Sequence, residues 1–141
     1  PQGNNIGTQP RDYVVQVTNQ PAGAEVIQTL QIDIPGIAFA ICGGARRTDG
    51  AALLVGDIFG LTSFDVRFEH SNGDRLTTIA GLGSSILGSA GSPRLIGGPG
   101  WVFDRGSTCR IGITPHNALL QITVNVWILE TRGPTNIGSL G

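Results

Sequence analysis

Strict alternation of apolar and polar residues constrains this chain more than any other feature. It is clearest between Leu119 and Glu130, where every even-numbered position to 128 is apolar: Leu120, Ile122, Val124, Val126 and Ile128. Residues two apart lie on the same face of a strand. The segment therefore predicts a long strand with these residues facing a core. The opposite face is polar at first but then carries Trp127 and Leu129.

The same period of two recurs along the chain, in residues 13–18, 26–34, 63–70 and 107–114, and each of these segments ends at turn-forming residues. The pair Asn72-Gly73 is a strong hairpin signal, and the return strand it predicts brings Arg75 near the acidic face of the preceding strand. Ile37 to Cys42 is a continuous apolar run, which predicts a strand buried on both sides. Residues 81–100 predict a long Gly/Ser-rich loop. The predicted fold is all-β, a jelly-roll-like antiparallel β-sandwich.

The two ends differ from this pattern. Residues 1–11 and 133–141 are rich in Gly, Pro and amide side chains and have little apolar surface to bury. We therefore divide the chain into an extended N-terminal arm (1–11), a sandwich domain (12–132) and an extended C-terminal tail (133–141). The core strands are expected to begin at Tyr13, and both ends are expected to become ordered only against neighbouring subunits.

Charge argues against several classes of partner. Charged residues make up 13% of the chain, about half the usual share, and the net charge is −1. All the basic residues are Arg, and no block of like charge is present. This pattern predicts neither nucleic-acid nor membrane binding, and a weakly charged surface favours protein contacts.

No residues stand in a pattern typical of catalysis. Ser84, Ser85 and Ser89 lie among glycines without a nucleophile motif, and a Walker loop would need a Lys, which the chain lacks. His70 and His116 have no Cys or second His at metal-ligand spacing. We therefore predict no catalytic, cofactor-binding or metal-binding residues.

Two further groups have a structural and a functional interpretation. Cys42 and Cys109, the two cysteines, lie among apolar or β-branched residues, which favours buried free thiols over a disulfide. The alternation of Asp65, Arg67 and Glu69 is typical of a cross-strand ion ladder, with recognition of a carboxylate or sugar ligand as the alternative.

Trp127 is the unexpected residue on its polar face. An outward Trp suits packing within the chain, a protein interface or stacking against a sugar. We take Trp127, Leu129, Arg11 and the apolar residues of the two ends, Ile6 and Ile137, as the candidate interface.

The order of segments over about residues 60–130 resembles small jelly-roll structural proteins of tailed bacteriophages. A strand like Ser63–Phe68 leads to a turn like Asn72–Arg75 and then to a Gly/Ser/Pro loop, here Gly83–Pro93. A turn like Asp104–Ser107 and an alternating strand like Ile122–Leu129 follow.

This resemblance implies a non-enzymatic capsid cement or decoration protein, on the capsid surface of a virion assembled in the host cytoplasm. Its implied partners are the major capsid protein and further copies of itself, as a dimer or trimer. A head-fibre, neck or tail protein is the alternative within the same class. A carbohydrate-binding β-sandwich is the competing class, and an enzyme ranks third.

Overall fold

The structure, a computed structural model, describes residues 6–50, 60–76, 80–89, 91–97 and 100–134. Strands account for most of this part of the chain. Their bounds are β1 Ile6–Thr18, β2 Val26–Gln31, β3 Gly36–Arg47, β4 Phe64–His70, β5 Gly81–Leu82, β6 Arg94–Leu95, β7 Trp101–Phe103, β8 Thr108–Pro115 and β9 Leu120–Pro134. The helix α1 spans only Gly83–Ile86. The predicted all-β class is confirmed.

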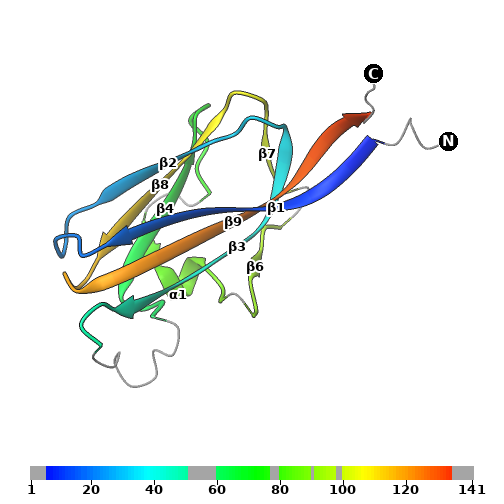
Figure 1. Ribbon diagram of the computed structural model, residues 1–141. Coiled ribbons are helices and arrows are strands. Elements are labelled where there is room, and N and C mark those ends of the chain that lie inside the picture. Colours follow the sequence, from blue (N-terminus) through cyan, green and yellow to red (C-terminus); the bar gives the residue numbers. More distant parts are fainter. Residues whose placement is uncertain (1–5, 51–59, 77–79, 90, 98–99, 135–141) are drawn as a thin grey trace.

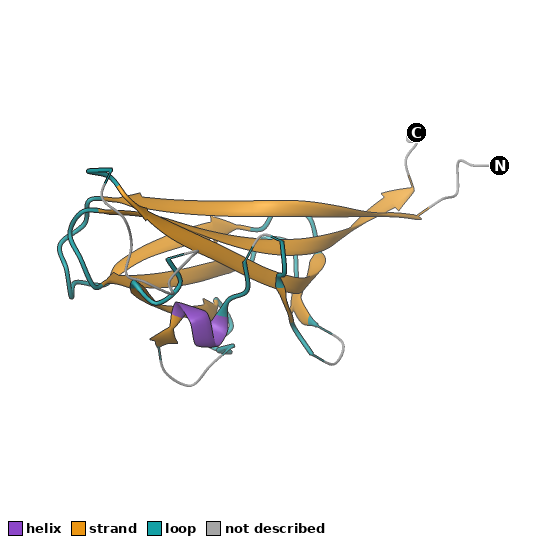
Figure 2. Ribbon diagram, turned by 90° about the horizontal axis from the view of Figure 1, so that it is seen from below, coloured by secondary structure: helices purple, strands orange, loops and turns teal. Residues whose placement is uncertain are grey.

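The strands form two antiparallel sheets that stack as a sandwich (Figures 1 and 2). The five-stranded sheet has the order β1-β9-β3-β6, with β7 also paired to β3, and the four-stranded sheet has the order β2-β8-β4-β5. The strands pair from the two ends of the chain inward: β1 with β9, β2 with β8, β3 with β6 and β7, and β4 with β5. In addition, β3 pairs with β9 and β4 with β8. Strands from opposite ends of the chain therefore lie side by side.

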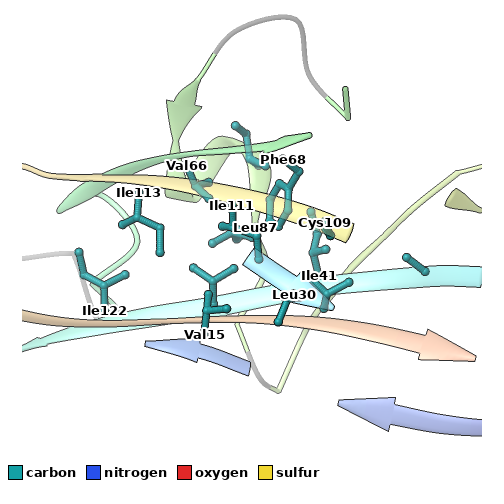
Figure 3. Close-up of a cluster of buried hydrophobic side chains, with 14 of the residues drawn as sticks. Val15, Leu30, Ile41, Val66, Phe68, Leu87, Cys109, Ile111, Ile113 and Ile122 are labelled. Atoms are coloured by element: carbon teal, nitrogen blue, oxygen red, sulfur yellow. The ribbon is translucent and has the colours of Figure 1, made fainter. Parts of the chain in front are cut away.

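The core lies between the two sheets (Figure 3). The even-numbered apolar residues of β9 predicted to face inward are buried, with exposures of at most 3%. Phe64, Val66 and Phe68 of β4 face them from the other sheet and are 0–1% exposed. Because strand alternation gives each sheet one apolar face, stacking the two faces removes both from water.

The chain ends differ from the prediction. β1 begins at Ile6 and not at Tyr13, and its first residues pair with β9, from Ile6 opposite Pro134 to Arg11 opposite Ile128. The ends of β1 and β9 extend together beyond the body of the sandwich (Figure 1). The composition argument counted only side-chain burial, whereas the backbone hydrogen bonds of a paired strand order residues of any side chain. Residues 1–5 and 135–141 lie outside the described residues.

Two local predictions are met in part. The Asn72-Gly73 turn is present, with Gly73 at φ +96° and its N–H bonded to the His70 carbonyl at 2.9 Å. After it, the return segment forms only a bridge between Glu69 and Arg75 within the described residues, and β4 pairs chiefly with β8. The predicted loop 81–100 contains β5, α1 and β6.

Candidate interaction surface

The outer face of the five-stranded sheet carries apolar side chains in rows that cross the strands. Residues directly opposite each other in an antiparallel pair have side chains on the same face. Leu129 lies opposite Pro10 of β1 and Ile37 of β3, and Ile37 lies opposite Val102 of β7. This first row crosses four strands, and Val102 is 53% exposed.

A second row runs beside the first. Trp127 lies between Asp12 of β1 and Ala40 of β3, and Ala40 lies opposite Leu95 of β6. Leu95 is 71% exposed, the largest value among the exposed large apolar residues of the described chain. The Phe39 ring lies 6.3 Å from the Trp127 ring and is tilted by 57°. The β-bulge between Ala38 and Ala40 places Phe39 here.

A third row adds Val14, which is 50% exposed and lies opposite Asn125. Asn125 donates from its amide to both oxygens of Asp12 at 3.0 and 3.1 Å. We call the set the outer apolar face: Pro10, Val14, Ile37, Phe39, Leu95, Val102, Trp127 and Leu129. Exposed apolar side chains gathered on one face of a domain, here around the hydrogen-bonded pair Asp12 and Asn125, are typical of a contact site.

Trp127 has an unusual polar atom. Its indole Nε1 is buried and has no hydrogen-bond partner, alone among the buried side-chain nitrogens and oxygens of the described residues. An unsatisfied buried donor destabilises a fold by about 1–3 kcal/mol. The indole therefore contributes apolar surface here without the hydrogen bond that usually accompanies a packed Trp.

The outer face of the four-stranded sheet is chemically opposite, because it carries an ion ladder. Glu69 accepts a hydrogen bond from Arg110 and lies 3.4 Å from Arg75 and 3.8 Å from Arg67. Arg67 also bonds Glu25 through two nitrogens, at 2.6 and 2.9 Å. The predicted ladder is confirmed for Arg67 and Glu69, whereas Asp65 lies 3.1 Å from His116 Nε2 instead. The predicted proximity of Arg75 to the acidic face is confirmed.

These contacts stabilise the charged forms of the ladder. Hydrogen bonds from Arg67 lower the pKa of Glu25. Burial opposes ionisation of Glu69, but the bond from Arg110 and the charge of Arg75 outweigh it and lower the pKa of Glu69. Gly112 of β8 leaves room for the ladder, since a Cβ at this position would clash with the Glu25 carboxylate and lie 2.9 Å from Arg67 Nε.

Beneath the five-stranded sheet, on its inner side, Arg11 has a partner within the chain. The Tyr13 hydroxyl donates to Glu130 Oε2 at 2.6 Å, and Arg11 Nη1 lies 3.7 Å from the same oxygen. The Arg11 guanidinium also lies 5.3 Å from the centre of the Tyr13 ring. Burial and the bond to Glu130 raise the pKa of Tyr13 to about 12.

His70 holds β7, and with it Val102, against the four-stranded sheet. Its Nδ1 accepts from the Asn72 N–H at 3.0 Å, so Nε2 carries the proton that is donated to the Val102 carbonyl at 3.0 Å. The ring stacks on Phe103 with centroids 4.4 Å apart and planes 4° from parallel. This arrangement gives His70 a structural role.

Both cysteines are free and buried, as predicted. Cys42 lies on the outer side of β3 opposite Asn125, and burial followed by the charge of Asp12 raises its pKa. Cys109 lies in the core, where burial raises its pKa to about 12. Thiolate formation is therefore disfavoured at both positions.

The structure brings together only part of the candidate interface predicted from sequence. Trp127 and Leu129 lie on the outer apolar face, whereas Arg11 is on the opposite side of the sheet. For Ile6 the structure describes only the backbone, which pairs with Pro134 at the start of β1. Ile137 lies outside the described residues.

Sequence reasoning missed the contributions of the other strands to this face. Val14 belongs to the alternating segment 13–18 but is 50% exposed, and Ile37, in the run predicted to be buried on both sides, is partly exposed. Leu95 and Val102 showed no signal beyond their apolar character. Their proximity to Trp127 depends on which strands are neighbours in the sheet. The alternation of apolar and polar residues along one strand does not reveal this order.

No protein-family model, curated protein or solved structure matches this chain. Within the described residues, no helix is long and apolar enough to cross a membrane, and no group of three or more His, Cys, Asp or Glu side chains is placed to hold a metal ion.

Proposed function

We propose that this chain is a structural protein of a virion, of the capsid cement or decoration type, and that it binds the major capsid protein through the outer apolar face. The observation that carries the proposal is the contrast between the two outer faces. One carries a network of ion pairs, with Ile27 as its one exposed large apolar residue among those described, and the other exposes Val14, Leu95 and Val102 near Trp127. A face of this second kind gains free energy when a protein covers it.

The pairing of strands from the two ends of the chain also supports the proposal. An antiparallel ribbon folded over on itself places the first strand beside the last and the second beside the next to last, as found here. That pairing is the one expected of a jelly roll, an architecture that recurs in viral capsid proteins as well as in lectins and cupins. Fold alone does not determine function, so the proposal depends on the surface.

A carbohydrate-binding module is the second candidate, and the partly exposed pair Phe39 and Trp127 favours it. Sugar stacking uses the flat face of an aromatic ring, and coplanar rings make the best platform. Here the two rings are tilted by 57° to each other, and aliphatic residues surround them. Both features suit a protein partner better than a sugar. Adding oligosaccharides to the protein while its tryptophan fluorescence is recorded distinguishes the two candidates. A saturable change in fluorescence would favour the carbohydrate-binding module.

The decisive experiment uses two matched variants, Val102→Glu on the outer apolar face and Ile27→Glu on the other sheet. The two side chains are similarly exposed, at 53% and 48%, so each variant should fold with a Tm close to the wild type. A carboxylate buried without a partner costs several kcal/mol, so Val102→Glu should reduce binding at least about tenfold. Ile27→Glu should bind like the wild type.

Binding is measured by sedimentation with virus particles from the natural source that have been depleted of this protein. Loss of binding in Val102→Glu alone supports the proposal. Equal binding by both variants would exclude the outer apolar face as the contact. A native protein that never sediments with a large particle of fixed stoichiometry would exclude a virion role.

A further inference from the structure

The outer edge of β1, which pairs with no other described strand, is a second surface suited to binding another chain. β1 lies at the end of the five-stranded sheet and pairs only with β9 among the described strands. An edge strand presents backbone N–H and C=O groups that can pair with another chain. This edge is long, since β1 has 13 residues.

The register shows which backbone groups face away from β9. The Asn19 N–H donates to the Leu120 carbonyl at 2.9 Å, so Asn19 points toward β9. Successive residues of a strand direct their backbone groups to alternate sides. Asp12, Val14, Gln16 and Thr18 therefore direct theirs to the outer edge.

We infer that two copies of this chain pair antiparallel along β1, about a two-fold axis at Val14, to form one continuous sheet. In this register Val14 lies opposite the partner's Val14, and Asp12 lies opposite the partner's Gln16. No like charges oppose each other, and two half-exposed β-branched side chains meet at the axis. The edge is therefore complementary to a second copy of itself.

The ends of the paired segment support this register over the one in which Thr18 lies opposite Asp12. Thr18 lies opposite the partner's Pro10, which has no N–H to donate. The Thr18 carbonyl does not need that donor, because it accepts from the Gln20 side-chain amide at 3.2 Å. The Thr18 N–H remains available for the partner's Pro10 carbonyl. A shift that places Thr18 opposite Asp12 would direct the Asp12 N–H at a carbonyl that is already bonded.

The dimer would join two outer apolar faces, since Val14 belongs to that face and lies at the axis. The use of this joined face rests on the proposed function. A dimer with two outer apolar faces can bind two neighbouring capsid subunits at once, which strengthens the overall binding. The dimer itself is tested on the isolated chain, so its failure and the failure of capsid binding are distinguishable.

The test uses the full chain with Val14→Cys, and Gln16→Cys as the matched control. Hydrogen-bonded antiparallel residues have Cα atoms about 5.5 Å apart, within the range of about 4.4–6.8 Å that a disulfide spans. Two copies of the Val14→Cys variant should therefore form a disulfide under mild oxidation. In the Gln16→Cys variant the two introduced thiols would be four residues out of register, roughly 13 Å apart along the strand, and should not cross-link. The natural cysteines are both buried and should not interfere.

A third variant, Val14→Pro, tests the hydrogen bonds. The Val14 N–H faces the edge and not β9, so proline is compatible with this position as it is at Pro10. Native mass from light scattering should be twice 14.7 kDa for the wild type, and Val14→Pro should raise the dissociation constant about tenfold or more. A wild-type monomer at all concentrations would overturn the inference. So would a dimer in which the Val14→Cys and Gln16→Cys variants cross-link equally or neither cross-links.

Discussion

Removing the hydroxyl of Tyr13 tests the cluster that Arg11, Tyr13 and Glu130 form on the inner side of the five-stranded sheet. Tyr13→Phe deletes a 2.6 Å hydrogen bond to Glu130, whose side chain is fully buried. A hydrogen bond to a charged group contributes about 1.5–3 kcal/mol. We expect the variant to lose about 2 kcal/mol of unfolding free energy at pH 7, which corresponds to a decrease in Tm of roughly 5–10 °C for a chain of this size.

The same variant has a defined pH dependence. The pKa of Tyr13 is about 12 in the folded protein against an ordinary 10.0. A pKa raised on folding stabilises the fold fully below the unfolded value, and this stability is lost as the pH rises from about 10 to about 12. The stability difference between wild type and Tyr13→Phe should therefore shrink over that range. Cys109 titrates in the same region in both proteins, so its effect cancels in the difference.

Absorbance measures this pKa directly, because Tyr13 is the only tyrosine in the chain. Phenolate absorbance near 295 nm should show a midpoint at about pH 12 in the folded protein and about pH 10 in denaturant. Glu130→Gln serves as the control and should lower the folded midpoint, since the Glu130 charge contributes to the shift. A folded midpoint near 10, or unchanged stability in Tyr13→Phe, would refute the reasoning.

Three further changes test other parts of the structure. Gly43→Ala should cost about 1–3 kcal/mol in urea unfolding, because its Cβ would lie 2.6 Å from the backbone oxygen of Thr123 in the paired strand β9; wild-type stability would exclude this close approach. Cys42 and Cys109 should react with a thiol reagent only slowly in the folded protein and both react in denaturant; denatured protein without free thiols would indicate a disulfide. Deleting residues 1–10 should lower stability by about 1–3 kcal/mol, since it removes part of the ladder between β1 and β9, and an unchanged Tm would show that this pairing contributes nothing.

Alternation along single strands allowed much of the fold to be predicted. The buried residues of β4, β8 and β9 follow from the period of two, as do the outward direction of Trp127 and the ion ladder around Arg67. These features are local, because a strand's side chains must point to alternate faces whatever lies beside it. The candidate site could be predicted only in part, through Trp127 and Leu129.

The strand order, by contrast, was decided by the tertiary structure. Pairing between β1 and β9 joins residues more than a hundred positions apart and orders residues 6–11 of the expected arm. The same order places Ile37, Val102 and Leu95 beside Leu129 and Trp127. Sequence determines which residues of one strand share a face, because that depends on backbone geometry. Which strands become neighbours depends on burying two whole sheet faces at once, and from that choice come the outer apolar face and the outer edge of β1.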